Sequence, residues 1–118
     1  MGGGQLGKML CLAAANWDCK IHVLDASPDY PAGPVCAEFT TGDFNNYDDV
    51  LAFGQDKDVL TIEIEHVNTA ALHALEAQGK IIHPRPAALD LIKDKGLQKQ
   101  FYAEQNLPTS PFQLFDNE

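Results

Sequence analysis

Two groups of residues have the types and the spacing to bind a small polar ligand. Gly2, Gly4 and Gly7 follow the pattern G-x-G-x-x-G, in which missing side chains let backbone N–H groups at a helix start approach an anion. Glu63 and Glu65 lie two residues apart in an alternating apolar segment, so we expect them on one face of a strand. The glycine turn is expected to hold a phosphate, and Glu63 to accept hydrogen bonds from an amine or hydroxyl of the same ligand.

Both features also have other interpretations. The glycine pattern occurs where only a tight turn and close packing are needed, and an acidic pair can be a solvated strand end. Asp25 follows Gly7 by 18 residues at the end of a predicted strand, where a dinucleotide-binding protein would contact ribose hydroxyls. A non-catalytic dinucleotide-binding module therefore stays open as an alternative, as does a purely structural fragment.

Alternating predicted elements place these residues in an α/β fold. Helices are expected over residues 5–16, 47–55, 69–78, 87–92 and 97–105, and strands over residues 20–25, 37–41, 58–65 and 80–83. This order is typical of a Rossmann-like, mostly parallel sheet with helices on both faces and ligands at the carboxyl ends of the strands. The apolar face of the first helix is expected to pack on this sheet, and Leu72, Leu75 and Phe101 to lie in the core.

We expect the opening strand of such a fold to be missing from the sequence. A phosphate-binding glycine turn normally follows a buried strand of about five or six residues, and here only Met1 precedes it. Because the first strand is central in a doubly wound sheet, its loss leaves two strand edges unpaired around a groove. We expect residues before Met1, or another chain segment, to fill that gap.

Composition limits the class of partner. The chain has 118 residues, of which 45% are apolar, enough for one ordinary core. Its net charge of −9 gives no support to nucleic-acid or membrane-surface binding, and no apolar run reaches the roughly 18 to 20 residues that span a bilayer. Cys11, Cys19 and Cys36 show neither metal-ligand nor disulfide spacing. We expect a cytoplasmic protein with reduced thiols and no metal site of its own.

Several segments together resemble one enzyme family. They are residues 2–9, the loop after Asp25 with Pro31-Ala32, residues 42–44, residues 63–67, His83-Pro84, and Asp94-Lys95 with Gln98-Lys99. Their order and spacing resemble the amino-terminal part of the 5-(carboxyamino)imidazole ribonucleotide synthases, the ATP-grasp ligases of purine biosynthesis. The resemblance covers essentially the whole chain. It implies a Rossmann-like pre-ATP-grasp domain at residues 1–106, then a linker and the start of an ATP-grasp domain at residues 107–118.

The resemblance also implies a reaction. These ligases convert aminoimidazole ribonucleotide, bicarbonate and ATP to the N-carboxylated product, ADP and phosphate, through carboxyphosphate. Mg-ATP is bound mainly by the ATP-grasp domain, so we expect residues 1–118 alone to be inactive and to supply no catalytic residue. The ligand-binding residues implied by the matching motifs are Gly4, Gln5, Leu6, Glu63 and Glu65 for the ribonucleotide and Lys95 for ATP.

One related enzyme stays open beside this family. Formate-dependent glycinamide ribonucleotide transformylase is a similar ATP-grasp protein whose corresponding domain shares the Glu-x-Glu strand end. The glycine turn does not separate the two enzymes. The family resemblance also suggests that the full-length enzyme is a homodimer.

Overall fold

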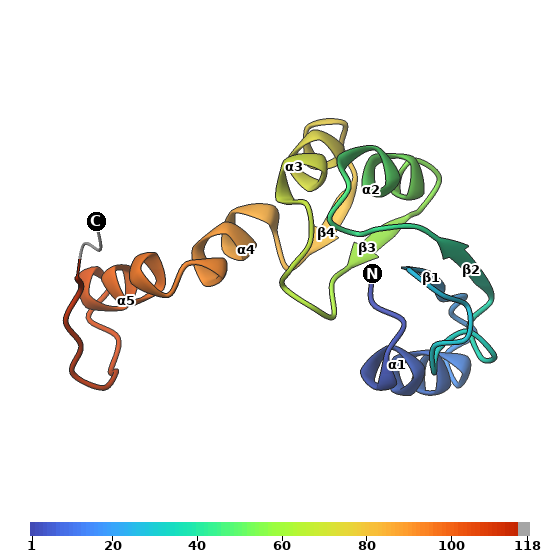
Figure 1. Ribbon diagram of the computed structural model, residues 1–118, viewed down its shortest axis with the longest axis horizontal. Coiled ribbons are helices and arrows are strands. Elements are labelled where there is room, and N and C mark those ends of the chain that lie inside the picture. Colours follow the sequence, from blue (N-terminus) through green and yellow to red (C-terminus); the bar gives the residue numbers. More distant parts are fainter. Residues whose placement is uncertain (116–118) are drawn as a thin grey trace.

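The computed structural model describes residues 1–115 as an α/β fold (Figure 1). Its elements follow in the order α1 (Gln5–Ala15), β1 (His22–Asp25), β2 (Glu38–Thr41), α2 (Tyr47–Gly54), β3 (Val59–Thr61), α3 (Thr69–Ala77), β4 (Ile81–His83), α4 (Pro86–Lys93) and α5 (Lys95–Glu104). The expected alternation of helices and strands is confirmed.

The strands pair in parallel, in two separate two-stranded sheets. In one sheet Val23 of β1 lies opposite Phe39 of β2, and in the other Leu60 of β3 lies opposite Ile82 of β4. Within residues 1–115, β1 and β3 do not pair with each other. The two unpaired edges expected around a groove are therefore present.

Helices cover both faces of β1. Leu24 belongs to a buried cluster that includes Val50 of α2 and Leu72 of α3, whereas Val23 belongs to a second cluster with Cys11 of α1. Neighbouring strand residues point to opposite faces, so α2 and α3 cover one face and α1 the other. Figure 1 shows α1 on the opposite side of the strands from α2 and α3.

Side-chain caps fix where three helices begin. Asn46 Oδ1 accepts hydrogen bonds from the N–H groups of Asp48 and Asp49 at the start of α2. Asn68 caps α3 and Asp94 caps α5 in the same way. Each cap gives an acceptor to N–H groups that have none inside the helix, which is why short polar side chains stand at these positions.

The strand predicted over residues 58–65 is shorter than expected and ends at Thr61. Its partner β4 ends at His83, and the next residue, Pro84, has no N–H to continue the ladder. Residues 63–65 lie in a bend instead. The prediction that Glu63 and Glu65 project from one face of a strand is therefore wrong.

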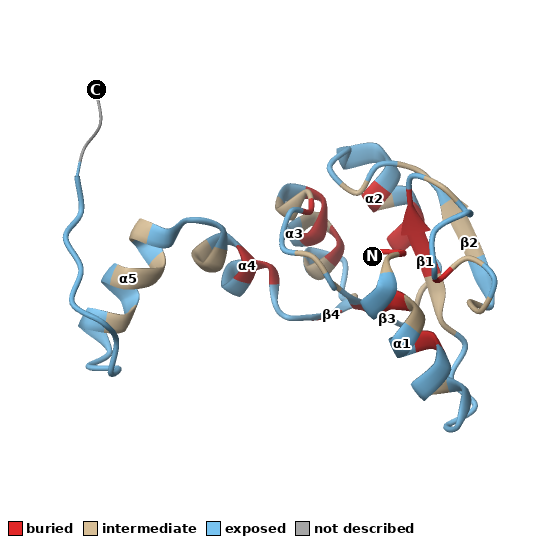
Figure 2. Ribbon diagram, turned by 60° about the horizontal axis from the view of Figure 1, so that its bottom comes forward, coloured by how far each residue is buried: buried red, intermediate tan, exposed pale blue. Residues whose placement is uncertain are grey.

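Two apolar surfaces expected in the core are exposed instead. Leu6 and Leu10 of α1 are 59% and 42% exposed, because they border the space between β1 and β3, which do not pair with each other. Phe101 is 37% exposed, because α5 extends away from the body and has no buried residue (Figures 1 and 2). Residues 107–115, expected as a linker, form no helix or strand, and residues 116–118 lie outside the described part.

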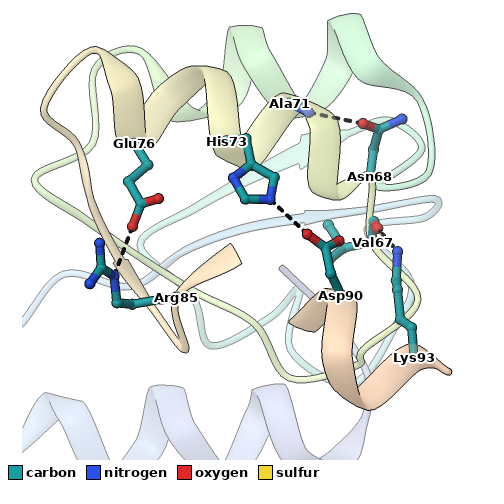
Figure 3. A network of polar contacts seen from close by, with 8 residues as sticks. All are labelled: Val67, Asn68, Ala71, His73, Glu76, Arg85, Asp90 and Lys93. Atoms are coloured by element: carbon teal, nitrogen blue, oxygen red, sulfur yellow. Dashed lines mark hydrogen bonds and ion pairs between the residues drawn. The ribbon is translucent and has the colours of Figure 1, made fainter. Parts of the chain in front are cut away.

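Polar contacts join α3 to the segment that follows it (Figure 3). His73 Nε2 lies 2.7 Å from Asp90 Oδ2, and the Lys93 ammonium donates to the carbonyl of Val67. Arg85 Nε donates to Glu76 Oε1 at 3.0 Å. These contacts hold α4 against α3.

None of the helices in residues 1–115 has both the length and the apolar character needed to cross a membrane.

Candidate functional site

The glycine turn is held by the carboxylate of Asp25 at the end of β1. The N–H of Gly3 donates to Oδ2 at 2.6 Å, and the N–H of Ala26 donates to Oδ1 at 2.7 Å. Asp25 is only 8% exposed, and hydrogen bonds to both oxygens offset the cost of burying its charge. The loop between β1 and β2 also holds the turn, because the N–H of Ala32 donates to the carbonyl of Gly3 at 2.9 Å.

The turn leads directly into α1 and leaves its first N–H groups free. Gly4 occupies the N-cap position, and no side chain within residues 1–115 caps this helix. The N–H groups of the first helical turn, on Gln5, Leu6 and Gly7, have no acceptor inside a helix. Together with the helix dipole they form a site of partial positive charge that suits an anion.

The three glycines of the turn differ in whether the backbone or the available space requires glycine. Gly2 has a φ of +113°, which side chains disfavour, and a Cβ on Gly7 would collide with the carbonyl of Gly2. A Cβ on Gly4 would meet nothing within 4 Å. Gly2 and Gly7 are therefore required by the turn itself, whereas the space above Gly4 is open.

Glu63 lies against this turn. A Cβ on Gly2 would lie 2.6 Å from Oε2 of Glu63, and the N–H of Glu63 donates to the carbonyl of Met1 at 3.1 Å. The Glu63 side chain is exposed, and within residues 1–115 its carboxylate accepts no hydrogen bond. Gly2, Leu6 and Glu63 line one cavity of about 170 Å³. A carboxylate free to accept hydrogen bonds thus stands beside an anion-binding helix start.

The other expected site residues lie elsewhere. Glu65 is exposed in the bend after Glu63 and does not line the cavity that Glu63 shares with Gly2. Lys95 stands at the start of α5, at the opposite end of the molecule from α1, and its ammonium lies 3.4 Å from Gln98 Oε1 (Figure 1). Of the expected site residues, Leu6 and Glu63 line one cavity, whereas Gly4, Gln5 and Lys95 do not line it.

Sequence reasoning missed the main role of Asp25. An acid at a strand end after a glycine turn is also the signal for ribose recognition, and the sequence does not show which way it faces. Here both oxygens already accept backbone N–H groups, an arrangement that does not favour a dinucleotide module. Within the described residues, no three His, Cys, Asp or Glu side chains gather as a metal site.

Comparison with known families decides which fold family this is. The ribonucleotide synthetase preATP-grasp domain matches residues 1–93, which include the glycine turn, Asp25 and Glu63. The chain belongs to this family. A ribonucleotide synthetase pre-ATP-grasp domain thus accounts for every element from α1 to α4, whereas α5 and Lys95 lie beyond the match.

Known relatives of this pre-ATP-grasp domain are longer enzymes. The chain is 33% identical to the N5-carboxyaminoimidazole ribonucleotide synthase of Brucella melitensis, over 100% of this chain and 32% of the relative. It is 36% identical to the chloroplastic phosphoribosylaminoimidazole carboxylase of Vigna aconitifolia, over 99% of this chain and 21% of the relative. The chain therefore spans about a third of the first of these relatives and about a fifth of the second, and the expected family resemblance is confirmed.

Solved structures agree with this assignment. N5-carboxyaminoimidazole ribonucleotide synthetase from Thermotoga maritima superposes with a TM-score of 0.90 at 35% identity, covering 98% of this chain and 32% of that one. The Aspergillus clavatus synthase, solved with ADP and 5-aminoimidazole ribonucleotide, gives 0.86 at 35% identity over 94% and 30%. A glycinamide transformylase from Mycobacterium tuberculosis shares the fold at 20% identity, with a TM-score of 0.87.

Proposed function

We propose that this chain is the amino-terminal, ribonucleotide-binding domain of a 5-(carboxyamino)imidazole ribonucleotide synthase. The full-length enzyme would convert aminoimidazole ribonucleotide, bicarbonate and ATP to the N-carboxylated ribonucleotide, ADP and phosphate. Residues 1–106 form the pre-ATP-grasp domain in this proposal, and residues 107–118 lead into the ATP-grasp domain. The carboxylating chemistry belongs to that second domain, so residues 1–118 alone are expected to bind ligand without turnover.

The contact between Gly2 and Glu63 carries the proposal. It sets a free carboxylate beside the free N–H groups of Gln5, Leu6 and Gly7 at the start of α1. An aminoimidazole ribonucleotide has a phosphate for the N–H groups and an amine or ribose hydroxyls for the carboxylate. Held at both ends, it would present its amine in a fixed orientation for carboxylation.

The local charges set which half of the ligand each group can hold. Glu63 and the nearby Asp25 are both acidic, so phosphate would be repelled from their side of the turn. The helix start at Gly4 has the opposite polarity, and its open space admits an anion. The phosphate is therefore assigned to α1, and the polar groups of the base and sugar to Glu63.

The remaining assignments rest on the family resemblance. Glu65 would add a second acceptor next to Glu63, and Lys95 would contact ATP supplied with Mg²⁺ by the following domain. An exposed Lys95 on the extended α5 is free to meet such a domain. The same resemblance supports a homodimeric enzyme in the cytoplasm.

The proposed reaction is tested with the full-length enzyme that carries this domain. Phosphate release from ATP should require both aminoimidazole ribonucleotide and bicarbonate, and glycinamide ribonucleotide with formate should give no release above background. The reverse preference would identify the transformylase instead. Binding of NAD that is lost in Asp25→Ala, with no response to either ribonucleotide, would identify a dinucleotide module.

A further inference from the structure

Two of the three cysteines come together beneath α1. Cys11 of α1 is buried in a cluster with Val23 of β1 and Ala32 of the loop between β1 and β2. Cys36, near the end of the same loop, packs against this cluster and is half-buried. The two cysteines are far apart in the sequence, so only the fold brings them into one cluster.

The loop that carries Cys36 runs alongside α1 in the same direction. Near the start of α1, the N–H of Ala32 donates to the carbonyl of Gly3 at 2.9 Å. Past Cys36, the N–H of Ala37 donates to the carbonyl of Ile21 at 2.8 Å. Ile21 shares a cavity with Leu10, which lies in the second turn of α1. The loop therefore follows α1 from its first turn toward its second.

The two segments also advance in step. A Cβ on Gly7 would lie 3.6 Å from the Cβ of Ala32. Cys11 follows Gly7 at the position i+4, one helical turn along α1. Cys36 follows Ala32 at the same spacing, and its N–H donates to the Ala32 carbonyl at 2.9 Å. Cys11 and Cys36 therefore face each other one turn beyond the contact between Gly7 and Ala32, where Cβ atoms approach to about the 3.5–4.5 Å that a disulfide requires.

The two thiols differ in their readiness to react. Burial, the larger cause, and the neighbouring Cys36 thiol both raise the pKa of Cys11. Cys36 is the more exposed of the two, so a small oxidant reaches it first. Cys19 is exposed after the end of α1, and its thiol donates to the carbonyl of Trp17 at 3.7 Å. It belongs to neither the cluster nor the pair.

We propose that Cys11 and Cys36 form a redox-responsive pair that closes to a disulfide when hydrogen peroxide reaches Cys36. The Cys36 thiolate attacks one peroxide oxygen. An S–O bond forms, the O–O bond breaks, and the departing hydroxide takes up the proton that Cys36 lost, which leaves a sulfenic acid. The Cys11 sulfur then attacks the Cys36 sulfur. The S–S bond forms, the S–O bond breaks, and the hydroxyl leaves as water with the Cys11 proton. The pair loses two electrons, and the peroxide becomes two molecules of water.

The disulfide would join α1 to the loop that holds the glycine turn. The Ala32 N–H already fixes the carbonyl of Gly3 on this side, and the new bond would prevent the loop from separating from α1. Neither Cys11 nor Cys36 lines the cavity that Gly2 shares with Glu63. The thiol pair is therefore independent of the proposed function and can be tested without a ribonucleotide.

The test treats the full-length enzyme with hydrogen peroxide under native conditions, alkylates the remaining thiols and maps disulfides by mass spectrometry. Digestion with trypsin and with a protease that cuts before aspartate places each of the three cysteines on its own peptide. The peptides of Cys11 and Cys36 should become linked, at a level at least about tenfold above any link to Cys19. The link should disappear after treatment with dithiothreitol.

Two matched variants separate the roles of the thiols. Cys11→Ala keeps the cluster apolar but removes the second thiol, so sulfenic acid should persist on Cys36. Its labelling by dimedone should rise at least about tenfold over the original enzyme. Cys19→Ser should leave both the link and the labelling as they are in the original enzyme. Circular dichroism before treatment verifies that each variant is folded.

Three results would overturn the proposal. One is oxidation of Cys36 in the original enzyme without any link to Cys11, and another is a link that joins either of them mainly to Cys19. The third is a link between Cys11 and Cys36 that forms only in urea, which would show that the folded chain keeps them apart. Each result comes from the original enzyme, so the proposal stays testable whatever the stability of the variants.

Discussion

The N–H of Gly3 donates a 2.6 Å hydrogen bond to Oδ2 of the buried Asp25, and this bond ties the glycine turn to the end of β1. The second oxygen of Asp25 accepts from Ala26 N–H. The carboxylate thus fixes the backbone from which α1 begins. The position of the free N–H groups of α1 relative to Glu63 depends on it.

Replacing Asp25 should destabilise the fold. Asp25→Ala removes the acceptor for two N–H groups and leaves that of Gly3 buried without a partner, which costs about 1–3 kcal/mol. Urea unfolding followed by circular dichroism measures this loss. The control Asp29→Ala changes an exposed residue of the next loop and should shift the free energy of unfolding by about 0.5 kcal/mol or less. Equal stability of the two variants would contradict the role given to Asp25.

Two glycines of the turn should respond differently to the same substitution. Gly7→Ala places a methyl group against the carbonyl of Gly2 and should cost about 1–3 kcal/mol, as overpacking does. Gly4→Ala meets nothing within 4 Å and should change stability by less than about 1 kcal/mol. Thermal unfolding of the two variants compares them. A stable Gly7→Ala variant would show that the turn and α1 pack less closely than described.

The local elements are largely predictable from the sequence, because caps and apolar periodicity act over a few residues. Asn46 and Asn68 mark helix starts that the structure confirms. The end of β3 was not predictable in the same way. The alternating pattern continues to Glu65, but pairing stops at Thr61 because the partner strand stops at His83, and that is a property of two distant segments.

Long-range packing also decides which apolar residues are buried. Leu6 and Phe101 have the same helical spacing as the buried Leu72 and Leu75, yet both are exposed. The difference lies in what each helix faces. The α3 helix belongs to the main buried cluster, α1 borders a groove, and α5 packs only loosely, against α4, and has no buried residue. Near the turn, the sequence predicted that the glycines lead into a helix, but not that Asp25 turns back to hold Gly3.

Stability should fall in acid as Asp90 is protonated. Hydrogen bonds from Thr69, the larger contribution, and from His73 lower the pKa of Asp90 below its ordinary 3.8. The stabilisation is fully present above pH 3.8 and is lost as pH falls through the lower folded value. Because the Asp90 side chain is 46% exposed, the loss should stay below about 1 kcal/mol.

The variant Asp90→Asn measures how much the ionised carboxylate of Asp90 contributes to stability. The variant should be less stable than the original chain at pH 6, and the difference should vanish at the acid end of a denaturation series from pH 6 to pH 2. Asp29→Asn serves as the control and should follow the original chain throughout. A stability difference for Asp90→Asn that stays constant across the series would rule out the carboxylate as its source.

The three thiols should differ in reactivity. Cys19 is exposed and Cys36 is half-buried, whereas Cys11 is buried and its pKa is raised by that burial. The thiolate is the reactive form, so an aromatic disulfide reagent at pH 8 should modify Cys19 first and Cys11 only after unfolding. Cys19→Ser should abolish the fast phase. A fast phase that persists in this variant would show that Cys11 or Cys36 is more accessible than described.

The most direct measurement is the affinity of the full-length enzyme for aminoimidazole ribonucleotide, determined by calorimetry. The original enzyme is compared with the variant Glu63→Gln and with a matched control, Glu104→Gln, which changes an exposed residue of α5. Loss of a charged acceptor should raise the Kd of the Glu63 variant about tenfold to a hundredfold and leave ATP affinity unchanged. The control should bind both ligands like the original enzyme. An unchanged ribonucleotide Kd in Glu63→Gln would show that this carboxylate and the neighbouring glycine turn do not form one binding site.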